Sequence, residues 1–408
     1  MNTKDETPNG GSLSEQKIHV CIVSYFPPSK GPLSEYSYHL VKNLAADPRT
    51  SKITVLADRI KEKYKEICID EKVEIIRSWN MDSITVPFSI VRNAYRVNAD
   101  IIYFGLILRY ISSNRFKNLI GLCSPYITKI LGIPIVITLH GGIPEINNLE
   151  DVGYKNSYIN MLGLKLAMKI VLMAADFVTV THPRFVDTLR TKYNGKRGVL
   201  YIPHGTLNSP LSHCDYYGKR LLFFGKVGKY KNLELALEAF RDLVKDNRDA
   251  ELVIAGSSNP LQPDLKQSIL QRYKSIPNVF TREYVAEEEL QDLFISCVAV
   301  ILPYSASTWS SGVFTLASTY GRPVIASDLP DFIELRNEGA GIILFPTQDK
   351  AALTKAMDLI VNNRELQKNL GEANLNWARR HSSIEVARRI VDVFDAVSKK
   401  RKTSLKIK

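Results

Sequence analysis

The sequence predicts an α/β protein of two Rossmann-like, doubly wound domains that face each other across a cleft. The chain has 408 residues, which is too long for one typical domain and suits two of roughly 200 residues each. Short β-branched runs alternate with segments of helical spacing, as in parallel sheets with right-handed crossovers. This alternation breaks once, near the middle of the chain, at a turn-rich segment that indicates a linker.

The first half of the chain carries the elements of one domain, predicted over residues 17–204. Residues 1–16 are polar and lack an apolar core, so we expect a disordered lead-in and not a signal peptide. Ser34–Ala46 has the spacing of an amphipathic helix. Strands are predicted at Lys17–Ser24, Ile53–Ala57, Val73–Ile76, Ile101–Phe104, Ile135–Thr138, Val178–Val180 and Val199–Ile202.

The second half contains a second series of strands and helices. Its predicted parts are a linker over 205–218, a Rossmann-like domain over 219–380, a helix over 381–398 that would cross back to the first domain, and a basic tail over 399–408. Leu233–Val244 is predicted to be an amphipathic helix. Strands are predicted at Leu221–Phe224, Leu252–Ala255, Val300–Leu302, Val324–Ala326 and Gly341–Leu344, with one more near Val279.

The apolar run that comes nearest to a membrane span is Leu162–Phe177. Lys165, Lys169 and Asp176 interrupt it, whereas a spanning helix needs about 20 predominantly apolar residues. We therefore expect a helix packed inside the protein.

Composition indicates a soluble globular protein, with 45% hydrophobic and 24% charged residues. The net charge is +12, and residues 1–210 carry 26 Lys and Arg against 18 Asp and Glu. This excess suits an anionic partner such as a phosphorylated substrate or an anionic membrane surface, although charge for solubility alone would give the same balance. Aromatic and basic residues do not interleave as in RNA-binding modules, so we expect no nucleic-acid partner.

Five cysteines stand at none of the spacings typical of metal ligands or redox pairs. The pattern predicts a reducing, cytoplasmic setting. A lipid-linked substrate would place the protein at the cytosolic face of a membrane.

Phe224–Leu233 is the first candidate binding segment. It follows a predicted strand and opens a helix, and Gly225 and Gly228 would let a phosphate approach the backbone. Lys226 and Lys231 are five residues apart and can both reach one diphosphate. The alternative is a solvated lysine-rich turn, and this segment alone does not separate the two interpretations.

Val300–Ser327 is the second candidate segment. A buried strand runs into a Ser/Thr-rich loop, and a helix then begins near Ser311 and Gly312. Ser310, Ser311 and Gly312 would present backbone N–H groups at that helix start. Two such helix starts in one domain favour a ligand with two anionic centres close together.

The order of these motifs resembles retaining glycosyltransferases of family 4, also described as glycosyl transferases group 1. That family shows Gly-Arg-x-x-x-x-Lys-Gly where this chain has the residues from Gly225 to Asn232, and its Pro-Val-Ile-Ala-Ser-Asp matches Pro323–Asp328. Ile137–Gly141 and Ile202–Gly205 match in the first half, with His204 where the family usually has Asn. The resemblance spans roughly residues 17–397.

The resemblance implies the paired-domain GT-B fold, with the first domain on the acceptor side. It implies transfer of a hexosyl group from a nucleoside-diphosphate sugar to a glycan or lipid-linked acceptor, with retention of configuration, no metal and no cofactor. His140 would contact the transferred sugar or assist the reaction. The donor diphosphate would be bound by Lys226, Lys231, Gly225, Ser310, Ser311, Gly312 and Gly31.

The chain departs from the family at two carboxylates. The family's glutamate pair corresponds to Thr308 and Leu316, and Leu316 cannot accept a hydrogen bond from ribose. The Ser-Gly-Val sequence that ends at Val313 resembles members of the family that also lack the pair. Asp328 or Glu334 would be substitutes, although both also suit helix capping.

Other polar residues are weaker candidates. Arg282 and Tyr284, after the strand near Val279, would lie along the nucleotide base, and Thr308, Val313 and Glu334 are further candidates for sugar or nucleotide contact. His182 and His204 also follow strands, and for both we favour a structural role. Trp309 suits either stacking on a sugar or a buried anchor.

Two functions therefore compete. One is an active hexosyltransferase working on a glycan or a lipid-linked carrier. The other is a subunit of the same fold that binds a nucleotide or sugar without turnover, which the changes at Thr308 and Leu316 favour.

Overall fold

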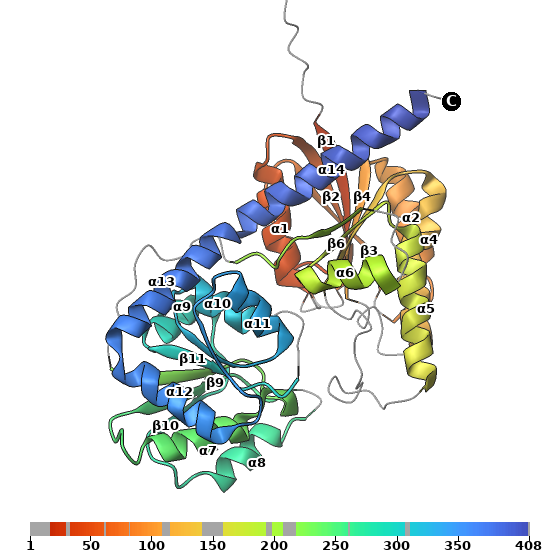
Figure 1. Ribbon diagram of the computed structural model, residues 1–408. Helices are drawn as coiled ribbons and strands as arrows, with labels where there is room; N and C mark the ends of the chain where they lie inside the picture. Colours follow the sequence, from red (N-terminus) through yellow and green to blue (C-terminus); the bar gives the residue numbers. More distant parts are fainter. Residues whose placement is uncertain are drawn as a thin grey trace, which may run out of the picture.

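The computed structural model describes residues 17–29, 33–60, 63–80, 82–107, 115–140, 158–192, 198–206, 218–259, 262–306 and 311–406, which form two parallel-sheet domains (Figure 1). The predicted lead-in over 1–16 and most of the predicted linker lie outside these ranges.

The first domain is a seven-stranded sheet in the order β3-β2-β1-β4-β5-β6-β7, with parallel pairing throughout. The strands are β1 Ile18–Val23, β2 Thr50–Asp58, β3 Val73–Trp79, β4 Ile101–Leu106, β5 Ile135–Leu139, β6 Phe177–Val180 and β7 Gly198–Tyr201. The helices are α1 Ser34–Ala46, α2 Val86–Val97, α3 Arg115–Leu122, α4 Ser124–Thr128, α5 Tyr158–Ala174 and α6 Pro183–Lys192, with a 3₁₀ turn η1 over Lys129–Leu131.

The second domain is a six-stranded parallel sheet in the order β10-β9-β8-β11-β12-β13. Its strands are β8 Arg220–Phe224, β9 Glu251–Ala255, β10 Val279–Arg282, β11 Ala299–Leu302, β12 Val324–Ser327 and β13 Ile342–Phe345. Its helices are α7 Leu233–Leu243, α8 Leu265–Arg272, α9 Glu287–Ile295, α10 Gly312–Thr319, α11 Pro330–Asn337, α12 Lys350–Asn362 and α13 Arg364–Arg380, with a 3₁₀ turn η3 over Lys229–Lys231.

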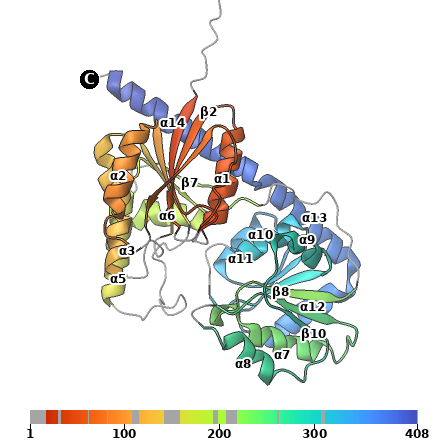
Figure 2. The same cartoon turned by 180° about the vertical axis from the view of Figure 1, so that it is seen from behind.

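Both sheets are covered on both faces, which explains why their strands are continuous apolar runs. In the first domain one core packs β1, β4 and β5 against α2, α5 and α6, and the other packs β1 and β2 against α1 and the long C-terminal helix α14, Ser383–Lys406. The view from behind shows α14 running across the first domain (Figure 2). The chain thus returns to its first domain after completing its second.

The two crossing segments between the domains are tied together. Thr206 donates its backbone N–H to the His381 carbonyl at 2.9 Å, and Ser383 donates to the Thr206 carbonyl at 3.1 Å. Beyond this point α14 inserts Val386, Ile390 and Phe394 into the core of the first domain. The helix continues to Lys406, so most of the predicted basic tail over 399–408 is the last part of α14.

One expectation about burial was wrong. The run Leu162–Phe177 forms most of α5, but the helix is not packed inside the protein, because Leu162, Leu166 and Met173 expose 55%, 48% and 44% of their surface. Ala167, Met168 and Val171 form its buried side. Helical packing buries only one side of a helix at the edge of a domain, however apolar the other side is. None of the described helices is long and apolar enough to cross a bilayer.

Candidate functional site

The loop after β8 is shaped by Gly225. Its φ is +96°, a region that L side chains rarely adopt, and its N–H donates to the Ala255 carbonyl at 2.8 Å. A Cβ at this position would stand 2.5 Å from the Nζ atom of Lys231. The backbone conformation therefore favours glycine here, and any larger residue would also displace the end of the Lys231 side chain.

Lys231 lies under this loop and is only 6% exposed. Its Nζ donates to the Phe224 carbonyl at 3.0 Å and stands 5.7 Å from the ring centroid of Tyr304. Burial lowers its pKa from 10.5 to about 8. Lys226, by contrast, is exposed at the surface of the loop. The two lysines predicted to bind one diphosphate thus differ in solvation, and Lys231 is the one whose charge most needs an anion beside it.

The start of α10 lies next to this loop. Val313 approaches within 3.5 Å of the position where a Cβ of Gly225 would stand, and Ser305 donates its N–H to the Tyr230 carbonyl at 2.8 Å. Ser311 caps α10, its Oγ accepting from the Phe314 N–H at 3.2 Å. The structure therefore joins the two candidate segments, although Thr308, Trp309, Ser310 and Gly31 lie outside the described residues.

His140 follows β5 and is buried against a second histidine. Its Nδ1 stands 3.0 Å from Nε2 of His204, and the ring of Tyr36 packs edge-on against both imidazoles at 4.4 and 4.9 Å. Burial holds the pKa of His140 well below its usual range and lowers that of His204 to about 4, so both rings are neutral at pH 7. Among the described residues, Nε2 of His140 has no hydrogen-bond partner.

Sequence reasoning missed the contact between His140 and His204. They are 64 positions apart and follow β5 and β7, which are separated in the sheet by β6. The one signal for it was the histidine that replaces the family's usual asparagine. His204 therefore contacts Nδ1 of His140, which leaves Nε2 of His140 for a ligand.

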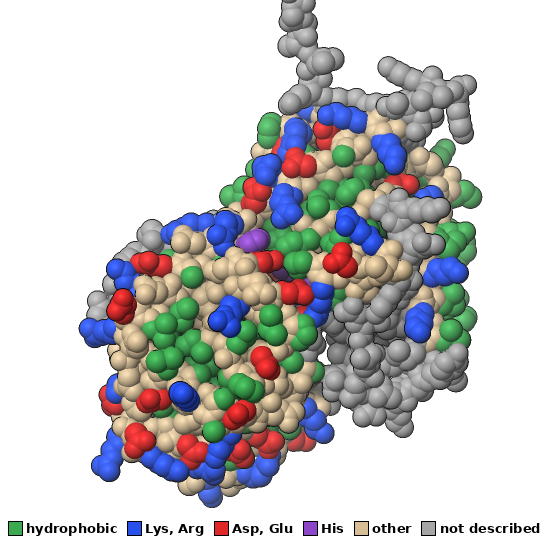
Figure 3. Space-filling model, viewed as in Figure 1, with side chains coloured by type: hydrophobic (Ala, Val, Ile, Leu, Met, Phe, Trp, Pro, Cys, Tyr) green, Lys and Arg blue, Asp and Glu red, His purple; other side chains and the backbone are tan. Residues whose placement is uncertain are grey.

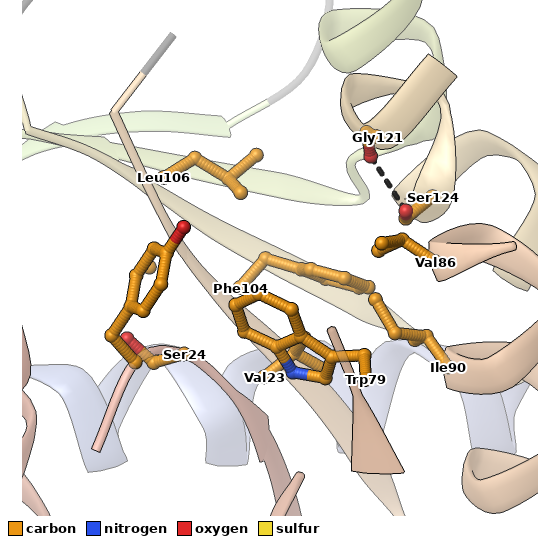
Figure 4. Close-up of a pocket in the computed structure, with 11 residues that line it drawn as sticks. Val23, Ser24, Trp79, Val86, Ile90, Phe104, Leu106, Gly121 and Ser124 are labelled. Atoms are coloured by element: carbon orange, nitrogen blue, oxygen red, sulfur yellow. Dashed lines mark hydrogen bonds between the residues drawn. The ribbon is translucent and has the colours of Figure 1, made fainter. Parts of the chain in front are cut away.

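A small apolar cavity of about 40 Å³ lies beside His140 in the first domain (Figure 4). Side chains from strands and from the helices above them enclose it, and Figure 4 shows Phe104 and Trp79 close to Ile90 and Val86. Gly105 lines the cavity and also lies near the histidine, since a Cβ there would stand 3.8 Å from Nε2. The sequence analysis did not predict this cavity.

The ends of β6 and β12 lead into residues that touch across the domain boundary. Nδ1 of His182 is 3.3 Å from the Glu334 carboxylate on α11, and Arg184 forms an ion pair with Asp331. The structure thus places Glu334 against the first domain. Its predicted contact with the donor remains a prediction.

The remaining candidates do not gather at Lys231. Arg282 and Tyr284 are exposed at the end of β10, an edge strand separated from β8 by β9. The Asp328 carboxylate accepts from the backbone N–H and the hydroxyl of Thr347 at 2.8 and 2.6 Å. Leu316 packs against the core of the second domain. No described group of three or more His, Cys, Asp or Glu residues could hold a metal ion.

Comparison with known proteins finds a family match in the second domain. Residues 218–363 match the model of the family described as Glycosyl transferases group 1. The match includes the loop after β8 and the start of α10.

Two of the relatives are mannosyltransferases by name. The chain is 26% identical over 231 residues to the GDP-mannose:glycolipid 4-beta-D-mannosyltransferase of Xanthomonas campestris pv. campestris, and 25% identical over 237 residues to the O-antigen chain mannosyltransferase C of Escherichia coli. These matches cover 56% and 55% of this chain. The chain matches only 60% of the length of each relative.

Solved structures show the fold. The chain is similar to Anabaena HepE, solved in complex with UDP and glucose, with a TM-score of 0.66 at 14% identity over 93% of this chain and 100% of HepE. It is also similar to the sucrose-phosphate synthase of Thermosynechococcus elongatus, with a TM-score of 0.72 at 16% identity over 93% of this chain and 99% of that one. The two parallel-sheet domains thus have the GT-B arrangement.

Proposed function

We propose that this protein transfers a hexosyl group from a nucleoside-diphosphate sugar to a glycolipid or glycan acceptor. The observation that carries the proposal is the buried Lys231 beside the start of α10. Lys231 has no carboxylate partner in the part of the chain that the structure describes; a cation so placed in a nearly dry site is costly, and a bound diphosphate would offset that cost.

The chemistry follows from where charge develops. As the bond between the anomeric carbon and the diphosphate oxygen breaks, negative charge accumulates on the leaving nucleoside diphosphate. Lys231 and the N–H groups at the start of α10 would stabilise that charge in place, without reorganisation of solvent. We propose that the donor is bound in this way without a metal or cofactor, and that transfer retains the anomeric configuration.

The acceptor side is proposed from the first domain. Neutral His140 can donate or accept a hydrogen bond through Nε2, depending on which nitrogen of the pair with His204 carries the shared proton. The apolar cavity that Gly105 lines would receive a non-polar part of the acceptor close to the sugar. The names of the relatives favour GDP-mannose as the donor and a glycolipid as the acceptor.

A second candidate is a subunit that binds a nucleotide sugar without turnover. The observation in its favour is Leu316, which lies in α10 where the family has a carboxylate and which packs into the core. Such a protein would bind donor through Lys231 and release no nucleoside diphosphate.

One experiment separates these candidates. Purified protein is incubated with GDP-mannose or UDP-glucose and a total lipid extract, and both donor binding and nucleoside diphosphate release are measured. We expect binding and release for the wild type, a loss of at least about tenfold in both for Lys231→Ala, and little change for Lys229→Ala, an exposed lysine of the same loop. Binding without release would support the non-catalytic subunit, and equal loss in both variants would contradict a specific role for Lys231.

A further inference from the structure

The outward side of α5 carries a stripe of apolar and basic residues. Leu162, Lys165, Leu166, Lys169 and Met173 follow one another at helical spacing, and all are exposed. The opposite side of the helix is buried in the domain core. In Figure 3 hydrophobic and basic side chains lie together along the edge where α5 runs. Both sides of α5 therefore bear large apolar groups, and the outward side also bears two lysines.

Helix α2 repeats this arrangement. Val86, Ile90 and Ala94 are buried, whereas Phe88 and Tyr95 are 69% and 73% exposed and Arg92 and Arg96 lie on the same outward side. Helix α4 packs between α2 and α5, and its Tyr126 is 48% exposed. The rings of Phe88, Tyr95 and Tyr126 are thus largely in contact with solvent, and no other ring of the described residues stacks on them. We call the outward side of α2, α4 and α5 the docking face.

The charge of this layer has one sign. The segments α2, α3, α4, η1 and α5 contain seven Lys and Arg and no Asp or Glu. One of these cations, Lys129, is paired with Asp176 at 3.4 Å. Helices of comparable length in the second domain, such as α7 and α12, carry acidic residues beside their basic ones. A protein partner would require a matching acidic surface, whereas an anionic bilayer provides both negative charge and an apolar interior.

We propose that the docking face binds the surface of an anionic phospholipid bilayer. Phe88, Tyr95 and Leu166 would enter the boundary between headgroups and acyl chains, where aromatic rings are favoured, and Arg92, Lys165 and Lys169 would pair with lipid phosphates. One helix of the docking face, α2, supplies Val86 and Ile90 to the wall of the apolar cavity from its buried side, so docking would place the bilayer across that helix from the cavity. The link to catalysis rests on the proposed function, whereas bilayer binding does not.

The test is sedimentation of the full chain with vesicles, without donor or acceptor. We expect binding to vesicles of phosphatidylcholine that contain about 30% phosphatidylglycerol, which gives a moderately anionic surface. We expect little binding to vesicles of pure phosphatidylcholine. Binding should weaken as ionic strength rises. The double variant Lys165→Glu/Lys169→Glu should bind at least about tenfold more weakly, because two attractive charges become repulsive. Phe88→Ser/Tyr95→Ser should also lose binding while keeping the response to salt.

Matched controls lie on the second domain. Lys274→Glu/Lys355→Glu makes the same change in net charge at two exposed lysines, and Leu359→Ser removes a side chain that is 47% exposed. Both should bind as the wild type does. The proposal is overturned if the control charge variant loses as much binding as the α5 variant, which would mean attraction by net charge alone. If Lys399→Glu/Lys400→Glu loses vesicle binding and the α5 variant does not, binding belongs to the end of α14, and the proposal is overturned as well.

Failure of this proposal is distinguishable from failure of the proposed function. Nucleoside diphosphate release with a water-soluble acceptor does not require a bilayer, so a docking-face variant should keep that activity. Circular dichroism and thermal unfolding of each variant exclude misfolding as the cause of lost binding.

Discussion

Lys231 is held where a positive charge is unfavourable in the absence of ligand. Its ammonium group donates to one carbonyl and lies near an aromatic ring, and no carboxylate of the described residues pairs with it. Such an arrangement lowers stability and is retained where it serves binding. A substitution at Lys231 should therefore change stability and ligand binding in opposite directions.

We expect Lys231→Met to stabilise the ligand-free protein while it weakens binding of GDP or UDP. The pKa falls from 10.5 in the unfolded chain to about 8 in the folded one, so the unfolded state holds more protons between these values. The cost of burying the charge is present in full below pH 8, at about 3 kcal/mol, and disappears as pH rises to 10.5.

Urea unfolding from pH 7 to 10.5 measures this effect. The difference in unfolding free energy between Lys231→Met and the wild type should shrink as pH rises. A constant difference would contradict the lowered pKa. Affinity for nucleoside diphosphate should also fall in the wild type above about pH 8, as the lysine loses its proton.

At the scale of elements, the ends of parallel strands bring histidines together. The segments after β5 and β7 place His140 and His204 in contact, and Tyr36 of α1 closes over both rings. Neither ring can take up a proton without charging a buried site. The pair is thus both a candidate contact for substrate and a source of acid sensitivity.

We expect the first domain to lose stability as pH falls from about 6.5 to about 4. The unfolded histidines bind protons in this window and the folded His204 does not, so the unfolding free energy should fall by about 3 kcal/mol for that residue. The variant His204→Asn removes one titrating group. Its unfolding free energy, followed by urea titration at several pH values, should depend less steeply on pH than that of the wild type, and an identical slope would refute this assignment.

At the scale of the whole molecule, a largely buried ion pair and a polar contact beside it help to hold the two domains together. Arg184 and His182 of the first domain meet Asp331 and Glu334 of α11, and the side chains of His182 and Asp331 are only 4% and 6% exposed. A buried carboxylate that loses its cation is strongly destabilising. These contacts therefore favour the orientation of the domains seen in Figure 1.

Arg184→Ala should lower the unfolding free energy by about 2 kcal/mol and widen the distribution of distances between the domains. Spin labels on exposed positions of α1 and α12 would measure that distribution. Arg220→Ala, which breaks the exposed ion pair of Arg220 with Glu251 inside the second domain, is the control and should change stability by less than about 1 kcal/mol. An unchanged distance distribution in Arg184→Ala would show that α14 and the strand-end loops alone fix the orientation.

The sequence by itself determined the fold class, the positions of the strands and of a few helices, and the two segments that meet beside Lys231. Helical and strand periodicity are local, so Ser34–Ala46 was predicted with the bounds that the structure shows. The motif order likewise indicated the resemblance to glycosyl transferases group 1 that residues 218–363 show, because turn glycines and helix starts are local features as well.

Only the tertiary structure decided which side chains are dry, which are paired and which remain exposed. The low pKa of Lys231, the contact of His140 with His204, the engagement of Glu334 across the domain boundary and the exposed side of α5 all depend on residues far apart in the chain. Desolvation and pairing are set by everything that surrounds a group, whereas a sequence pattern reports only its neighbours along the chain. For this reason the sequence could predict a phosphate contact for Lys231 but could not show that its charge is buried.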